Sequence, residues 1–233
     1  MASIQASSGN LAQGLSEPLD YAEIIRAVDV AAIEEHMRFL SSFTSRSIGY
    51  PGFYMSAEYV FDEFVEAGLQ NVSYDEFRVP EAIDHGANVT VLSTGEIFTI
   101  FPMKPNFGAP STTPPGGVSG KLIYARKGHL SDFDGLDAQG SIVLLDWDTG
   151  LRWINAAKLG ARAVIFLPSV YVPDIAVPRT IQVPFAFPRF CVDEEGAGVL
   201  LQHLDEEVKV VARTYWENVR GLNVVGFLEG TGT

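Results

Sequence analysis

Cysteine is almost absent from this chain: Cys191 is the one thiol among 233 residues. A single cysteine excludes an internal disulfide and a cysteine-rich metal site, and its apolar neighbours predict a small buried side chain. Long apolar runs are also missing, since none reaches the roughly 18 residues that a membrane-spanning helix needs. Residues 1–19 lack the apolar core of a signal peptide. We expect them to form a flexible tail; the compartment stays open, with the cytoplasm favoured.

Positive charge is scarce as well. The chain has 16 Lys and Arg residues against 29 Asp and Glu residues, a formal net charge of −13. Nucleic-acid binding needs a basic stripe to meet the phosphates, so the sequence predicts no nucleic-acid partner. With 47% apolar and 19% charged residues, the composition is typical of a folded protein of one large domain or two small ones.

Clustered metal ligands are lacking. The histidines His36, His85, His129 and His203 are scattered, and none lies in an H-E-x-x-H or H-x-D arrangement. We expect each to be structural or on the surface. No Gly-x-Ser-x-Gly elbow or phosphate-binding loop is present either. The sequence therefore predicts no catalytic residue, no metal ligand and no cofactor in this chain.

Two acidic motifs leave alternatives open. Asp84-His85 suggests chemistry, but adjacent residues on an extended segment point to opposite faces, which favours a polar pair at a turn. Asp132, Asp134 and Asp137 resemble a calcium loop, yet Asp137 stands where such a loop needs glycine and the distal glutamate is missing. A solvated turn is favoured, although weak calcium binding stays possible.

The stretch from Gly117 to Leu167 carries the strongest pattern. Apolar runs at Lys121–Ala125, Ser141–Asp146 and Ala163–Leu167 predict buried strands. A short helix before the third run should end at Gly160, where a residue tolerant of positive φ is needed. Strand, helix and strand in this order make a right-handed crossover if the two strands are parallel.

Further elements flank this stretch. One helix should carry Val30, Ile33, Met37 and Leu40 on one face, and a second should run from about Ser56 to Ala67. The remaining predictions are a strand at Asn71–Val79, a hairpin of Val89–Leu92 with Glu96–Phe101, a proline-rich loop at Pro168–Pro188, a helix at Glu194–Leu204 capped by Asp193, and a strand at Glu207–Tyr215.

The pattern in Gly117–Leu167 resembles the protease-associated (PA) domain, a module inserted in zinc aminopeptidases, subtilisin-like proteases and sorting receptors. Ser45-Arg46, Gly49, Gly52 and Gly68-Leu69 resemble the helical lead-in of zinc aminopeptidases. The segment "NVVGFLEG" (223–230) resembles the first strand of their catalytic domain. The resemblance implies an α+β fold: a β-sandwich or open barrel with short helices, preceded by a helical segment.

The resemblance also implies a domain order and a role. Residues 20–80 would be the lead-in with its first strand, 81–214 the PA domain, and 215–233 a linker and the first strand of a catalytic domain absent here. Zinc and its ligands would belong to that domain. The chain would be non-catalytic, shaping substrate access or contacting peptides, proteins and the catalytic domain. Alternatives are a free-standing peptide-binding module of sorting-receptor type and a self-sufficient hydrolase using Asp84, His85 and the acidic turn.

Five residues are candidates for peptide or protein contact. Trp147 and Trp153 flank a turn at the carboxyl end of a buried strand, where ligand sites of α/β sheets tend to lie. Tyr171, Arg179 and Phe187 belong to the proline-rich loop, together with Phe185. Two other interpretations stay open: the tryptophans cover the junction of helix and sheet, and the loop packs on a neighbouring domain.

Overall fold

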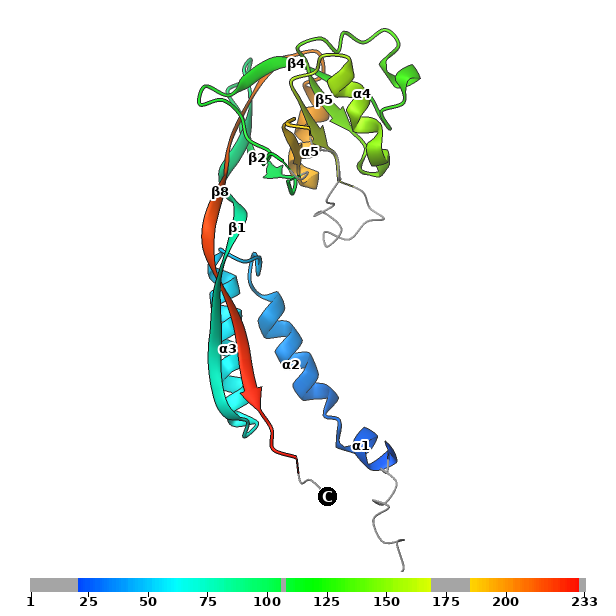
Figure 1. Cartoon of the computed structure of the whole chain (residues 1–233). Helices are drawn as coiled ribbons and strands as arrows, with labels where there is room; N and C mark the ends of the chain where they lie inside the picture. Colours follow the sequence, from blue (N-terminus) through cyan, green and yellow to red (C-terminus); the bar gives the residue numbers. More distant parts are fainter. Residues whose placement is uncertain (1–20, 106–107, 169–184, 231–233) are drawn as a thin grey trace, which may run out of the picture. The chain divides into compact units, whose positions relative to one another are not determined.

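The computed structural model describes residues 21–105, 108–168 and 185–230 and has an α+β fold (Figure 1). The described residues form five α-helices, two short 3-10 helices and one eight-stranded sheet. Two compact units share this chain. Unit 1 consists of the residues up to Phe77 together with those from Arg220, and unit 2 is Arg78–Val219.

Unit 1 begins with three helices, α1 (Tyr21–Ala27), α2 (Val30–Ser41) and α3 (Pro51–Glu66). The α2 helix is predicted correctly. Asp29 caps it, because its carboxylate accepts hydrogen bonds from the next turn. The predicted start of α3 at Ser56 is wrong. The helix starts at Pro51, because proline is favoured in the first helical turn, where its missing N–H costs nothing.

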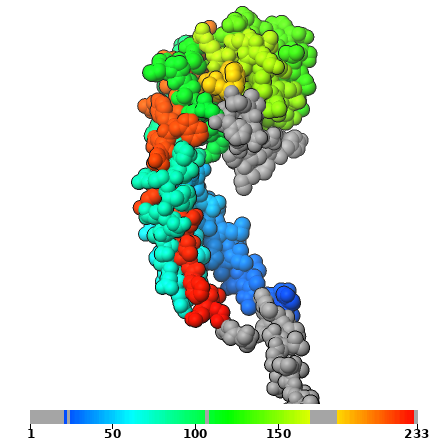
Figure 2. Space-filling model, in the orientation of Figure 1, coloured from blue at the N-terminus to red at the C-terminus, as the bar shows by residue number. Residues whose placement is uncertain are grey.

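Helix α2 keeps its apolar face open. Val30, Ile33 and Met37 are 72%, 47% and 65% exposed, and no residue of α2 is buried. In Figure 2 this helix, in blue, lies open on the face of unit 1 that is in view. Phe39 and His36 both contact Tyr59 of α3: the Phe39 ring centroid lies 4.2 Å from that of Tyr59, and His36 Nδ1 lies 2.6 Å from its hydroxyl.

Helix α3 packs on the two strands of unit 1. Phe61 stacks on Tyr74 of β1 at 4.9 Å. The Tyr54 hydroxyl donates a 3.0 Å hydrogen bond to the carbonyl oxygen of Arg220 in β8. These contacts join α3 to β1, the strand that follows it directly, and to β8, which lies more than a hundred residues further along the chain.

The two long strands correct the predicted strand pattern. Asn71–Val79 and Val89–Leu92 are not separate strands, because β1 runs without a break over Gln70–Val91. Likewise β8 spans Glu207–Phe227, joining the predicted strand Glu207–Tyr215 to the segment that resembles a catalytic-domain strand. The predicted boundaries at 80/81 and 214/215 fall inside these strands, which the compact units divide at 77/78 and 219/220.

The predicted parallel strands are confirmed in unit 2. They are β4 (Val118–Tyr124), β5 (Ile142–Leu145) and β6 (Ala163–Phe166), and they pair in that order. A strand that the sequence did not indicate, β7 (Arg189–Cys191), pairs parallel to β6. The predicted crossover helix is α4 (Trp153–Lys158), followed by Gly160 at φ +89°.

The sheet curls into an open barrel. Its order is β2-β1-β8-β4-β5-β6-β7-β3, so the short strands β2 (Ile97–Thr99) and β3 (Phe101–Pro102) are its edges. These edge strands are neighbours in sequence, separated only by Ile100, which is fully buried. Because a single residue joins the two edge strands, the sheet between them must curve until its edges are close together, as the predicted open barrel requires.

Alternate residues of β5 build two cores, one on each face. Ile142 and Leu144 join the cluster that includes Leu200 of α5 (Glu194–Gln202), whose predicted Asp193 cap is confirmed. Val143 and Leu145 join the cluster that includes Trp153 of α4. The two helices therefore cover opposite faces of the parallel strands (Figure 1). Cys191 is 8% exposed in the second core, as predicted.

No described helix is both long enough and apolar enough to cross a membrane.

Candidate functional site

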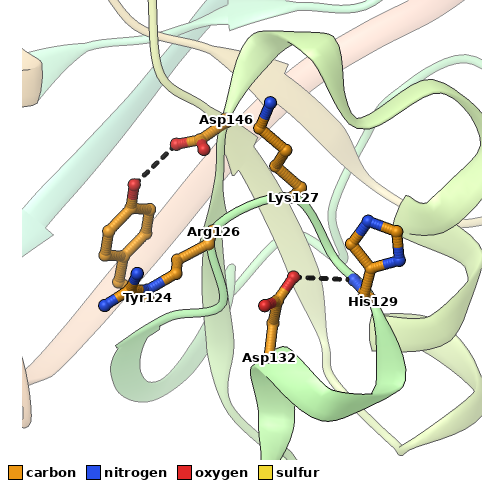
Figure 3. A pocket seen from close by; sticks show the side chains of 6 residues that line it. All are labelled: Tyr124, Arg126, Lys127, His129, Asp132 and Asp146. Carbon is orange, nitrogen blue, oxygen red and sulfur yellow. Dashed lines mark hydrogen bonds between the residues drawn. The ribbon is translucent and has the colours of Figure 1, made fainter.

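A pocket of about 290 Å³ lies at the carboxyl ends of the parallel strands β4 and β5 in unit 2 (Figure 3). Tyr124 is the last residue of β4, and Asp146 directly follows β5. Ligand sites of parallel sheets form at such ends, because the following loops diverge there. The side chains that line the pocket are polar or charged: Tyr124, Arg126, Lys127, His129, Asp132 and Asp146.

A tight turn after β4 brings these side chains together. Arg126 adopts φ +42°, a left-handed conformation that costs energy for a residue with a Cβ, and Gly128 follows at φ +72°. The Arg126 carbonyl oxygen accepts a 2.7 Å hydrogen bond from the Asp146 N–H. Asn155 of α4 donates a 2.8 Å hydrogen bond to the Gly128 carbonyl oxygen. The turn is thus held by both the neighbouring strand and the crossover helix.

Tyr124 and Asp146 form the inner polar pair of the pocket. The Tyr124 hydroxyl points at the Asp146 carboxylate and donates a 2.6 Å hydrogen bond to Oδ1 (Figure 3). Burial and then this hydrogen bond raise the pKa of Tyr124 to about 12, because both oppose formation of a phenolate. Tyr124 is therefore a hydrogen-bond donor, not a proton carrier, at neutral pH.

The cations of the turn differ in their partners. Lys127 Nζ lies 2.8 Å from Asp148 Oδ2; this hydrogen bond raises the pKa of Lys127 and lowers the pKa of Asp148. For Arg126, no carboxylate of the described residues lies within ion-pair distance. The pocket thus combines the Arg126 guanidinium, which has no ion-pair partner among the described residues, with the carboxylates of Asp146 and Asp132. Such a site suits a ligand that carries both a negative group and hydrogen-bond donors.

The acidic turn supplies one pocket residue and no metal centre. Asp132 Oδ2 accepts a 2.9 Å hydrogen bond from the His129 N–H, while Asp137 Oδ1 accepts from Gln139 N–H. Among residues 21–105, 108–168 and 185–230, no three or more His, Cys, Asp or Glu side chains gather as metal ligands would. The described residues thus do not fit the zinc that the resemblance associates with a catalytic domain.

The other histidines have local partners. His36 Nδ1 lies 2.6 Å from the Tyr59 hydroxyl, and His85 contacts Glu217. His203 lies between Glu206 and Glu96, with nitrogen–oxygen distances of 3.1 and 3.5 Å. His129, in contrast, lines the pocket. Asp84 Oδ1 accepts a hydrogen bond from Gly86 N–H, so the structure does not bring Asp84 and His85 together with the acidic turn.

The structure buries two of the predicted contact residues. Trp147 is 7% exposed and Trp153, the first residue of α4, is 0% exposed, and both belong to the second core. Phe187 is half-buried beside that core. Tyr171 and Arg179 lie outside the described residues. Peptide or protein contact by these residues stays a prediction.

Trp153 belongs to a stack of aromatic rings that ends at a buried guanidinium. Its centroid lies 6.0 Å from Phe187 and 6.5 Å from Phe185, with the rings within 21° of parallel. Arg189 Cζ lies 4.9 Å from the centre of the Trp153 ring. We call these four residues the Trp153–Arg189 cluster.

Arg189 is fully buried, and burial lowers its pKa to about 10, so it stays charged at neutral pH. Nη2 donates a 3.0 Å hydrogen bond to the Lys104 carbonyl oxygen. Nε and Nη1 find no acceptor in the part of the chain that the structure describes. A desolvated cation–π contact is worth about 2 kcal/mol. The desolvation of an unpaired charge costs several kcal/mol, which is more than this contact returns.

Sequence reasoning missed most of this pocket. Tyr124, Arg126 and Lys127 attract no attention as isolated residues, and His129 is expected to be structural or on the surface. The signal that could find them is their position just after a buried parallel strand, where ligand sites form. Arg189 could be noticed as a charge inside the apolar segment "FPRFCV", where a buried charge needs a partner.

Solved zinc aminopeptidases share this fold. Two structures of BSAP, a zinc aminopeptidase from Bacillus subtilis, superimpose with TM-scores of 0.62 and 0.63 at 20% identity, covering 84% and 87% of this chain. A peptidase M28 precursor from Shewanella amazonensis gives a TM-score of 0.51 at 16% identity over 81% of this chain. No protein-family model matches the sequence, and no curated protein sequence does.

The match covers less than half of these peptidases. This chain spans 46% and 47% of the two BSAP structures and 48% of the Shewanella precursor. At 20% identity and below, the likeness establishes a shared fold.

Proposed function

We propose that this chain is the non-catalytic, protease-associated region of an aminopeptidase-like zinc metallopeptidase, where it shapes substrate access or contacts peptides and proteins. Two observations together carry the proposal: the part of BSAP that this chain matches, and the metal ligands that the described residues lack. The fold matches BSAP over 84% of this chain but over 46% of BSAP. The described residues hold no cluster that could serve as a zinc site.

Exposed apolar surface in unit 1 supports a further domain as partner. Besides the open face of α2, Val225 and Phe227 near the end of β8 are 48% and 57% exposed. Apolar side chains gathered in this way mark surfaces that another protein surface covers. A peptidase catalytic domain in the same polypeptide is the partner that the proposal assigns, and zinc would be held there.

Unit 2 supports the accessory role. Its polar pocket offers a guanidinium, a lysine and two carboxylates at one sheet edge, which suits the charged ends and polar backbone of peptides. A free-standing module of sorting-receptor type would use the same pocket. The uncovered face of α2 favours the peptidase context, because a free-standing module gains nothing from exposing it.

A peptidase assay tests the proposal. Purified residues 1–233, loaded with zinc or with cobalt, should hydrolyse no aminoacyl-p-nitroanilide above the rate of a metal-only blank, with BSAP as positive control. Turnover that follows protein concentration and vanishes with a chelator would show that the chain is itself a metallopeptidase. In that case the self-sufficient hydrolase would replace the accessory region.

A further inference from the structure

Three buried N–H donor groups in the Trp153–Arg189 cluster lack an acceptor among the described residues. They are Nε and Nη1 of Arg189 and Nε1 of Trp153. Buried donors in folded proteins almost always have a partner, and a charged donor most of all. The cluster therefore calls for an acceptor that carries negative charge.

The described surroundings of Arg189 supply no such acceptor. Its one hydrogen bond goes to the Lys104 carbonyl oxygen, and its one ring contact is with Trp153. The Lys104 ammonium, which could also attract an anion, is already paired with the Glu81 carboxylate at 2.9 Å. No described carboxylate forms an ion pair with Arg189. The positive charge is thus left for an external partner.

The aromatic rings indicate what the rest of that partner looks like. Phe185 and Phe187 are nearly parallel, with centroids 5.8 Å apart, and both stack with Trp153. The three centroids lie 5.8 to 6.5 Å from one another, so the rings form a compact triangle. Phe185 is 42% exposed and Phe187 is half-buried, whereas Trp153, which contacts the guanidinium, is 0% exposed. Flat apolar surface of this kind accepts another aromatic or apolar group.

We infer that the Trp153–Arg189 cluster is a binding site for a carboxylate attached to an apolar or aromatic body, such as the C-terminal residue of a peptide. The carboxylate pairs with Arg189, and the apolar body lies along Phe185 and Phe187. A planar monoanion suits a guanidinium in apolar surroundings better than phosphate, which is more strongly hydrated and needs more donors. This inference rests on the cluster alone and holds whether or not the chain belongs to a peptidase.

Two matched ligands test the site in the full chain. N-acetyl-phenylalanine carries the carboxylate, and N-acetyl-phenylalaninamide is the same body without the charge. We expect calorimetric binding and a raised melting temperature with the acid but not with the amide. Inorganic phosphate at the same ionic strength is the third arm, and equal stabilisation by phosphate would overturn the carboxylate assignment in favour of general anion binding.

Variants separate this site from nonspecific attraction. Arg189→Met should weaken binding of the acid by about thirty-fold or more, because the buried pair is lost. It should also melt higher than the parent without ligand, because an unpaired buried charge is replaced by an apolar chain. Phe185→Ala should weaken binding several-fold with little effect on melting. Arg46→Met, an exposed arginine of unit 1, is the matched control and should change neither property.

The contrary outcomes are distinct. If Arg189→Met lowers the melting temperature and the parent binds no acid, the protein itself satisfies the guanidinium and the inference fails. Binding of the acid that survives in Arg189→Met would place the ligand elsewhere. Should Arg189→Met not fold, Arg189→Lys keeps the charge but loses the planar fork, and it should bind the acid at least about ten-fold more weakly. Undiminished binding by that folded variant would also overturn the site.

Discussion

Tyr124 holds its hydroxyl proton to an unusually high pH. Its folded-state pKa is raised to about 12 by burial and by the Asp146 carboxylate. Because the raised pKa favours the neutral form, the stability that it contributes is full below about pH 10, the unfolded value, and is lost as pH rises towards 12. Subtracting the phenolate titration of Tyr124→Phe from that of the parent should reveal one tyrosine ionising near pH 12. A difference curve centred near pH 10 would contradict the buried hydrogen bond.

At Gly120, the backbone of a neighbouring segment lies too close to leave room for a side chain. A Cβ at this position of β4 would overlap the Gly140 carbonyl oxygen and lie 3.1 Å from the Ser141 Cα. Both neighbours are backbone, so they cannot turn away. Gly120→Ala should therefore lower the free energy of unfolding by about 1–3 kcal/mol in urea titrations. Gly116→Ala is the control, since nothing lies within 4 Å of its added methyl group. Equal stability of the two variants would show that β4 is not tightly packed there.

At the scale of elements, the central strand β5 should be the least tolerant of charge. All four of its residues are buried, and Leu144 pairs with Tyr124 on one side and Ile165 on the other. Leu144→Asp buries an unpaired carboxylate at a cost of several kcal/mol and should unfold unit 2. Leu151→Asp, at a residue that is 58% exposed, should change the unfolding free energy by no more than about 0.5 kcal/mol. Circular dichroism during heating makes the comparison, and unchanged melting of Leu144→Asp would remove β5 from the core.

The elements that sequence predicts well are those with a local signature. Strands β4, β5 and β6 are apolar runs between turn residues, and Gly160 marks the end of α4. Strand β7 has no such signature, because it is three residues long and follows a proline-rich loop. The continuity of β1 is also hidden: Pro80 and several charged residues interrupt its apolar pattern, and its neighbour β8 lies more than a hundred residues away.

The pocket is less predictable than the strands, because it depends on which strands become neighbours. Tyr124 and Asp146 meet only since β4 and β5 pair in parallel and end together. The left-handed turn at Arg126 then aims the following residues at the same space. Sequence can indicate the strand ends, but the pairing that joins them is a property of the folded sheet.

At the scale of the whole molecule, the two units should differ in protection from hydrogen exchange. In α3 only Gly52 and Ala57 are buried, and α2 has no buried residue, whereas every residue of β5 and β6 is buried. Amides in the α2 and α3 helices should therefore exchange faster than those of β5 and β6. Mass spectrometry at two protein concentrations measures this exchange. If α2 and α3 are protected as strongly as β5 and β6 at both concentrations, the helices are covered within a single chain and the prediction is wrong.

The continuity of strands β1 and β8 limits which changes of length the chain can tolerate. Each strand crosses from one unit to the other without a loop, at residues 77/78 and 219/220. Side chains alternate faces along a strand, so inserting or deleting one residue at a crossing would turn every following side chain to the wrong face. A viable change of length would have to come in pairs of residues and in both strands at once. The two strands should therefore tolerate insertions and deletions only in steps of two residues, whereas a loop would accept a change of any length.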